Sequence, residues 1–371
     1  MKSFSKLILI TLCTLAIAGC DNNKATAKSY SKFSYISDKC QVIGAIDIKE
    51  IAKMENVQKM LQEDQTIPYY KEIKASGLGL DNLNCLYFGA EIPASVDQAS
   101  IQSEGVFLLE AKSEINLPEF ISLAEKNNNI KFKTETIGAK QAYILSNDST
   151  ADTPPTYIIQ LNDKLIAIGT KAEITNTVTL FEKGGKSVLD NAGLMKTADN
   201  GQSKDMVWFA ASVPPEVNKE NDPNSPDIND LFISANYINE ILTINGKIVC
   251  ATDQDAQKIL MPAQILTSMA VMTSNNTIKP EDLSIKADKN NLDISIKLSK
   301  EALKNMMEKS ASQIQQQPVV TEEVITEEIL APDTSLATNA PVVKPVVKPV
   351  VKPVVKPVAP VTAPKAPVKT N

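Results

Sequence analysis

Apolar residues recur at two characteristic spacings between about residue 38 and residue 310 of the chain. A spacing of two puts alternate side chains on one face of a strand, and a spacing of three to four puts them along one side of a helix. In residues 38–150 these spacings predict the order strand–helix–strand–strand–helix–strand–strand. The expected strands are residues 40–48, 83–92, 105–111, 130–137 and 141–145, and the expected helices begin near Ile51 and Leu117.

A second run of elements follows the polar, proline-containing segment at residues 152–155. Hairpins are expected where short apolar strands flank turn residues, at Asn162-Asp163, Asn245-Gly246 and Asn290-Asn291. Asp253 is expected to cap a helix that Pro262 kinks or divides. The other expected elements are a helix within residues 171–193, a strand at 206–213, a polar loop at 214–230 and a closing helix through 302–307.

Both runs suggest the strand–helix–strand–strand–helix–strand order of ferredoxin-like folds. We therefore predict an α+β protein with mainly antiparallel sheets, built from two consecutive ferredoxin-like-related halves at residues 38–150 and 155–312. No strong residue identity links the two halves.

The first residues have the features of an export signal. Lys2 and Lys6 precede an apolar run at residues 7–17 that is too short to span a bilayer as a helix, and the run ends in Ile17-Ala18-Gly19-Cys20. These four residues resemble the lipobox of bacterial lipoproteins. The resemblance implies cleavage between Gly19 and Cys20 and acylation of Cys20, with palmitate-type chains. The alternative is an ordinary secretory signal with a chance cysteine.

The lipoprotein interpretation divides the N-terminal region into a signal peptide at residues 1–19 and a lipidated cysteine with a flexible tether at residues 20–37. It places the protein in the cell envelope, on the outer face of the inner membrane or in the outer membrane. The sequence from Val249 to Asp253 and the later hairpin at 285–298 also look faintly like modules of bacterial surface lipoproteins. That second likeness names no activity.

The last part of the chain, residues 313–371, has a different composition. An acidic stretch is followed by Pro-Val-Val-Lys repeats from Pro341 to Pro357, without the periodicity of a core. Such a composition predicts a disordered tail, extended as polyproline II. Its lysines could bind a cell-wall polymer or another anionic envelope component, or the tail could be a spacer without a partner.

Composition narrows the chemistry of the body. The chain has no histidine, and every basic side chain is lysine. A Ser-His-Asp triad, a His-ligated zinc and an arginine clamp for phosphate are therefore excluded. The net charge of −6 makes nucleic acid an unsuitable partner. No cofactor and no metal site are predicted.

Three cysteines remain in the processed chain, and the envelope permits disulfides. Cys40 and Cys85 each begin an expected strand and are candidates for a disulfide, although their strand faces argue against the bond. Cys250 and Trp208 are expected in the core. A partial P-loop match at residues 184–187 and an acidic loop with Glu220, Asp222, Asp227 and Asp230 are interpreted as a helix end and a solvated loop.

These observations favour a non-enzymatic, membrane-anchored lipoprotein whose body binds or scaffolds another envelope component. Two alternatives stay open. One is a surface-anchored binder of a small ligand or peptide between the two halves, and the other is a hydrolase that uses carboxylates alone, for which no pair stands out. A deep apolar pocket would favour the ligand binder, and a flat or groove-like surface would favour the scaffold.

Overall fold

The structure is a computed structural model that describes part of the chain. The described residues are 30–54, 57–58, 70–92, 105–128, 131–145, 154–200, 205–215, 225–273, 278–303 and 305. The chain divides into two compact units, residues 1–317 and 318–371, and every described residue belongs to the first. The predicted signal peptide, Cys20, Glu220, Asp222 and the predicted tail from 313 lie outside the described residues.

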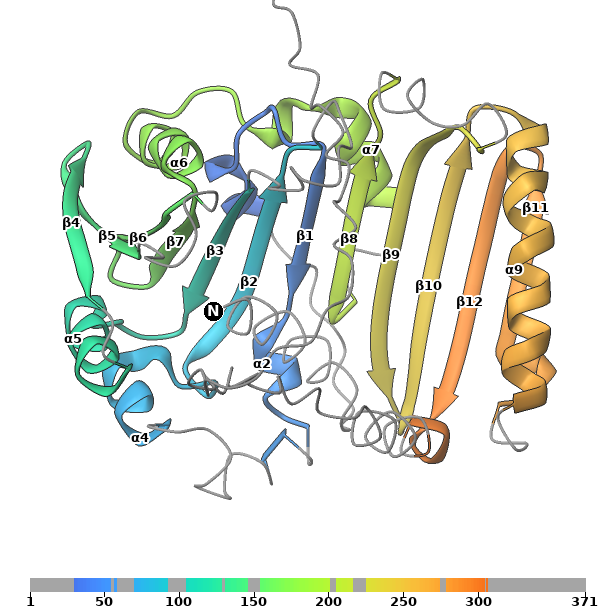
Figure 1. The fold of residues 1–371 in the computed structure, drawn as a ribbon, viewed down its shortest axis with the longest axis horizontal. Coiled ribbons are helices and arrows are strands. Elements are labelled where there is room, and N and C mark those ends of the chain that lie inside the picture. The colour runs from blue at the N-terminus through green and yellow to red at the C-terminus, as the bar shows by residue number, and fades with distance from the viewer. Residues whose placement is uncertain are drawn as a thin grey trace, which may run out of the picture. The chain divides into compact units, whose positions relative to one another are not determined.

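One twelve-stranded sheet runs through the described part of the chain, in the order β11-β12-β10-β9-β8-β1-β2-β3-β7-β6-β5-β4 (Figure 1). Neighbouring strands of this sheet pair antiparallel. The predicted α+β class with a mainly antiparallel sheet is therefore confirmed. The strands are β1 (Val42–Ile46), β2 (Leu83–Ala90), β3 (Gly105–Ala111), β4 (Phe132–Ile137), β5 (Lys140–Leu145), β6 (Thr156–Asn162), β7 (Leu165–Gly169), β8 (Val207–Ser212), β9 (Ile228–Ile238), β10 (Ile241–Cys250), β11 (Leu283–Asp288) and β12 (Asn291–Ser299).

The division into two halves at residues 150–155 is wrong. Strands β6 and β7 come after that boundary, yet they lie between β3 and β5, which come before it. On the other side, β1 pairs with β8 as well as with β2. Each predicted half would have had open sheet edges, and pairing across the boundary satisfies the backbone groups of those edges.

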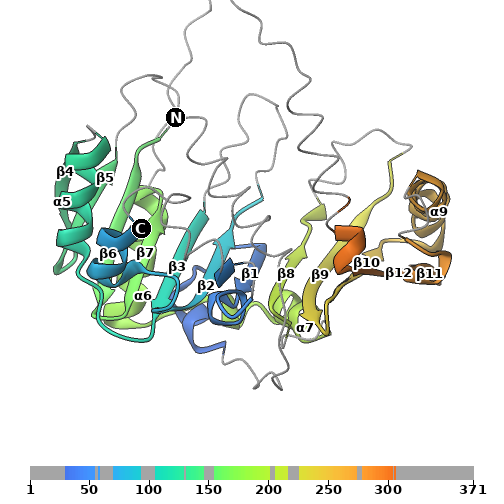
Figure 2. The same ribbon diagram turned by 90° about the horizontal axis from the view of Figure 1, so that it is seen from below.

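Helices cover both faces of the sheet (Figure 2). The face that we call the α6 face carries η1 (Tyr30–Tyr35), α6 (Lys171–Lys183), η3 (Val188–Asp190) and α7 (Ala192–Asn200), packed on a core that includes Trp208, Ile43 and Leu108. The opposite face, the α9 face, carries α2 (Ile48–Ile51), α4 (Tyr70–Ile73), the π-helical η2 (Lys74–Leu78), α5 (Leu117–Asn128), α9 (Asp253–Thr273) and η4 (Pro280–Asp282).

The predicted tether at residues 20–37 is wrong from Tyr30 onward. Phe33 and Ile36 are 1% and 0% exposed, and they pack into the core of the α6 face. Lys32 Nζ lies 3.2 Å from a carboxylate oxygen of Glu110 on β3. The aromatic side chains of this segment pack with the core of the α6 face, and residues 21–29 of the predicted tether lie outside the described residues.

Three predicted helices differ in detail from the structure. The helix expected within residues 171–193 ends at Lys183. Gly184 adopts a positive φ of 70° there, and its N–H donates a hydrogen bond to the carbonyl oxygen of Leu180, which closes the last turn. Thr252, and not Asp253, is the cap of α9: its hydroxyl donates to the Asp255 carboxylate (2.6 Å) and accepts from the Asp255 N–H (3.1 Å). Helix α9 continues through Pro262, and residues 300–303 begin the closing helix.

Candidate functional site

Ten neighbouring strands of the sheet present only uncharged residues to the α9 face. In sheet order these strands are β6, β7, β3, β2, β1, β8, β9, β10, β12 and β11. The register aligns one residue from each of these ten strands in a row across the sheet, which we call the central row. At about 4.8 Å per strand the nine steps span about 43 Å. The central row consists of Ile158, Ile168, Phe107, Phe88, Gly44, Phe209, Ile233, Gly246, Ile294 and Ile285.

The middle of the central row is open. Both ends of the row are packed. Ile158 and Ile168 lie against the core cluster that contains Leu117 and Ile121 of α5, and Ile285 lies against the cluster that contains Ala256 of α9. Five side chains between these ends, which we call the open segment, belong to none of the four core clusters of the described residues: Phe88, Phe107, Phe209, Ile233 and Ile294. All five are partly exposed, and Phe107 is 43% exposed.

The rings of the open segment are held in place by their neighbours. Phe88 and Phe107 are paired across β2 and β3, with ring centroids 6.3 Å apart. The ring of Phe88 lies over Gly44, where an added Cβ would come within 2.3 Å of the ring. Because Gly44 has no side chain, the ring can lie flat on the central strand. The open segment is thus an apolar surface made by strand side chains.

Helix α9 adds a second apolar surface. Its inward side packs Ala256, Ile259 and Leu260 onto the sheet. Its outward side exposes five large apolar residues, at 55–83% of their surface: Met261, Ile265, Leu266, Met269 and Met272. No described helix is long and apolar enough to cross a membrane.

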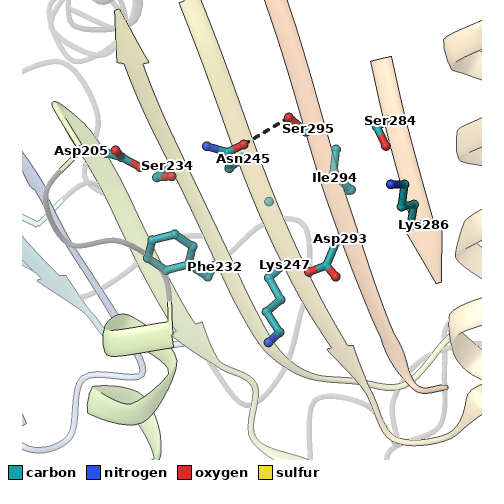
Figure 3. A pocket seen from close by; sticks show the side chains of 11 residues that line it. Asp205, Phe232, Ser234, Asn245, Lys247, Ser284, Lys286, Asp293, Ile294 and Ser295 are labelled. Carbon is teal, nitrogen blue, oxygen red and sulfur yellow. Dashed lines mark hydrogen bonds between the residues drawn. The ribbon is translucent and has the colours of Figure 1, made fainter. Parts of the chain in front are cut away.

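A polar cavity of about 530 Å³ lies on the α6 face of β9–β12 (Figure 3). Two rows of side chains line it. Ser234, Asn245, Ser295 and Ser284 are aligned in one row, and Phe232, Lys247, Asp293 and Lys286 in the next. The Ser295 hydroxyl donates to the Asn245 amide oxygen (3.2 Å). The two sides of the same four strands therefore differ sharply, with hydroxyls, an amide and charges on one side and only apolar residues on the other.

The candidate disulfide is not formed. Cys40, Cys85 and Cys250 are all free and buried. Cys40 lies beside Gly89 at one end of β2, whereas Cys85 lies four residues away, about 13 Å along the strand. Burial, and then the charge of Glu173, raises the pKa of the Cys40 thiol to about 12. A thiol with such a pKa is a poor nucleophile.

Cys250, Trp208 and residues 184–187 lie where the sequence predicted them. Cys250 is fully buried under α9, and burial followed by the charge of Asp255 raises the pKa of its thiol. Trp208 is 1% exposed in the core of the α6 face. Residues 184–187 end α6 and cap η3, so they form a helix end and not a phosphate loop. Among the described residues no group of three or more Cys, Asp or Glu could hold a metal, and Asp227 and Asp230 belong to no such group.

Sequence reasoning missed the open segment. The strands were expected, but alternation alone does not say which face is covered. The signal that was available is the aromatic content, since Phe88, Phe107 and Phe209 all lie at strand positions that face the same way.

Comparison with known proteins gives only remote similarities. No family model matches the chain, and no curated protein matches it. The solved structures that resemble it include crystal forms III, I and IV of TP0453, at 11%, 11% and 10% identity. They cover 77%, 76% and 75% of this chain and 100%, 98% and 99% of TP0453, with TM-scores of 0.45, 0.42 and 0.43.

Proposed function

We propose that the chain is a membrane-anchored envelope lipoprotein with a non-enzymatic body that binds the apolar part of an amphiphilic ligand on the open segment. The lipid anchor at Cys20 and the envelope location are inferred from the sequence around Ile17-Ala18-Gly19-Cys20. The binding surface is inferred from the structure.

The observation that carries the binding proposal is the uncharged α9 face with its open middle. Partly exposed Phe and Ile side chains on adjoining strands form a continuous apolar surface, and such surfaces in soluble proteins mark binding sites. From Phe107 on β3 to Ile294 on β12 the open segment covers six strand steps, about 29 Å. Half the hydrocarbon thickness of a bilayer is about 15 Å, so the open segment is longer than one acyl chain needs.

The ligand binder was an alternative to a scaffold in the sequence interpretation. An apolar strip on rigid strands favours a ligand with an extended apolar segment, because each buried methylene contributes about 0.8 kcal/mol and no polar partner is required. The surface is open and row-shaped and is not a deep pocket, so it also fits the scaffold interpretation, in which the apolar segment belongs to a peptide or protein partner. A fatty acid and a peptide can be compared directly as ligands.

The binding test uses the chain from Asp21 to Asn371 and a fluorescent long-chain fatty acid. Ile294→Asn places an amide in the open segment and should weaken binding about tenfold or more. The adjacent substitution Ser295→Asn lies on the opposite face of the same strand and should leave binding unchanged. Mass spectrometry of material extracted from the purified chain would identify a natural ligand. Equal binding by both variants would contradict the site.

The anchor is tested separately in cells. Cys20→Ser removes the sulfur that takes the lipid, so the variant should remain uncut or be processed without an acyl group. Mass spectrometry of the parent protein should show an acylated Cys20, and a processed parent chain with an unmodified Cys20 would contradict anchoring by this cysteine.

For the tail we propose diffuse attraction to an anionic envelope polymer. Lys344, Lys348, Lys352 and Lys356 recur every fourth residue, whereas polyproline II has three residues per turn, so the lysines would be distributed around the axis. The Debye length falls from about 10 Å at 0.1 M salt to about 3 Å at 1 M. Co-sedimentation of the tail with purified cell wall should therefore be lost at high salt, and equal binding at both salt levels would contradict the proposal.

A further inference from the structure

Helix α9 is apolar on both sides. From Ile259 to Ile278 the chain has no charged residue, and the lysines Lys258 and Lys279 flank this segment. Ala256, Ile259 and Leu260 face the sheet, and on a helix of 3.6 residues per turn the positions 261, 265, 269 and 272 fall on the opposite side. A helix that is apolar all round is normally buried.

The outward stripe is large. Met261, Ile265, Leu266, Met269 and Met272 are 63%, 59%, 66%, 55% and 83% exposed, and all come from one helix. Helix α9 is fixed to the body along its other side by β10, β11 and β12. The stripe is thus presented on a rigid support, and burying it would not require the helix to unfold or move.

We infer that this stripe lies in the apolar boundary of the bilayer that holds the protein's own lipid anchor. The inference rests on the proposed anchor at Cys20. Helix α9 would lie in the plane of the interface, the arrangement in which an apolar helix side is buried about 5–10 Å into a membrane. The flanking Lys279 suits that position, because lysine side chains reach the headgroups while their stems stay in apolar surroundings. Lys258, at the other end, pairs with Asp255 of the same helix, with Nζ 2.9 Å from the carboxylate.

A short tether to the proposed anchor keeps the whole body close to the bilayer, although η1, where the tether joins, lies on the α6 face and not beside the stripe. The first described element, η1, begins at Tyr30, so Asp21–Ser29 are the nine residues between the proposed anchor and η1. A flexible segment of nine residues has an r.m.s. length of about 15–18 Å and cannot exceed about 30 Å. A body held so close to the bilayer has a high effective concentration for it.

The first test measures vesicle binding without the anchor. The chain from Asp21 to Asn371 is mixed with phosphatidylcholine vesicles, which have no net charge, at 0.1 M and 1 M salt. Binding through the stripe should persist at 1 M salt, whereas attraction of the tail lysines requires anionic lipid and is screened. Leu266→Asp combined with Met269→Asp should weaken binding about tenfold or more, because charged residues are costly in an apolar phase.

The matched control changes exposed polar positions of the same helix. Gln257→Asp combined with Gln264→Asp adds the same charge outside the stripe, and should change binding less than threefold. Both double variants should melt within a few degrees of the parent. A fluorophore on Met272→Cys should shift to shorter wavelength when vesicles are added.

The remaining outcomes overturn the inference. If both double variants bind vesicles as the parent does, or if the parent binds none, the stripe does not contact lipid. If the parent is a dimer that Leu266→Asp dissociates, the occupant is a second copy. The vesicle assay uses no lipid anchor, and the fatty-acid assay uses no vesicles. A failure of vesicle binding would therefore overturn the inference about the stripe and leave the proposals for Cys20 and the open segment to be decided by their own tests.

Discussion

Helices α6 and α9 both cover a face of the same sheet, but their outward sides have opposite character. The exposed residues of α6 are mainly polar, Lys171, Thr175, Thr179 and Glu182 among them, whereas those of α9 include Met261, Ile265, Met269 and Met272. Helix α6 has the pattern of a helix against water. The difference shows that packing on the sheet accounts for the inward side of α9 and not for the apolar residues that its outward side exposes.

The largest expected effect concerns the inward sides. Ile174 of α6 is fully buried, so Ile174→Ala should lower the free energy of unfolding by about 2–5 kcal/mol. Ile259 of α9 is only partly buried, so Ile259→Ala should cost less, about 1–2 kcal/mol. Urea denaturation of the two variants gives the ranking. A larger loss for Ile259→Ala would mean that α9 contributes more to the core than its exposure indicates.

The helix caps should differ by a smaller amount. Thr252→Ala removes a two-way hydrogen bond with Asp255 at the start of α9 and should cost about 1 kcal/mol. Thr170 accepts from the Glu173 N–H at 3.4 Å, a longer contact, so Thr170→Ala should cost less. Thermal melts at fixed pH compare the two, and equal losses would contradict the ranking by distance.

Asp255 makes the stability of α9 depend on pH. Hydrogen bonds from Thr252 and then Lys258 hold the pKa of its carboxyl below the ordinary value. The resulting stabilisation is present above the ordinary pKa, and is lost as the pH falls through the lowered pKa of the folded state. Asp255→Asn should therefore destabilise the protein at pH 7 and change little at pH 2. A difference that grows on acidification would have the wrong sign.

The smallest expected effect is that of a reducing agent. Since all three body cysteines are free, reduction should leave the melting temperature unchanged, and three thiols should titrate in the denatured, unreduced chain. In the native protein, Cys250 under α9 should react faster than Cys40, if α9 opens more readily than the α6 face. Vesicles should slow that reaction. A count of one free thiol would restore the predicted disulfide.

The sequence predicted most of the individual elements. Strands alternate apolar and polar residues. The hairpins predicted at Asn162-Asp163 and Asn290-Asn291 do form, with their turns one residue away, at Asp163-Lys164 and Lys289-Asn290. The turn predicted at Asn245-Gly246 is wrong, because both residues lie inside β10, which pairs with β12 and β9 along its length. The β9–β10 turn falls at Asn239-Glu240, which adopt positive φ values of 52° and 64°. Gly246 is tolerated inside the strand because Ile294 packs beside it.

What the sequence determined by itself is local: the lipobox-like start, the absence of histidine and arginine, the strands with their alternating faces, and the uncharged run in α9. Tertiary structure alone decided that the predicted halves share one sheet, that Tyr30–Tyr35 belongs to the body, and that Phe88, Phe107, Phe209, Ile233 and Ile294 align in one open row. The reason is physical. Periodicity determines which side of an element is apolar. The residues that pack against that side are determined by the strand order, and the strand order depends on edges that pair across long stretches of chain.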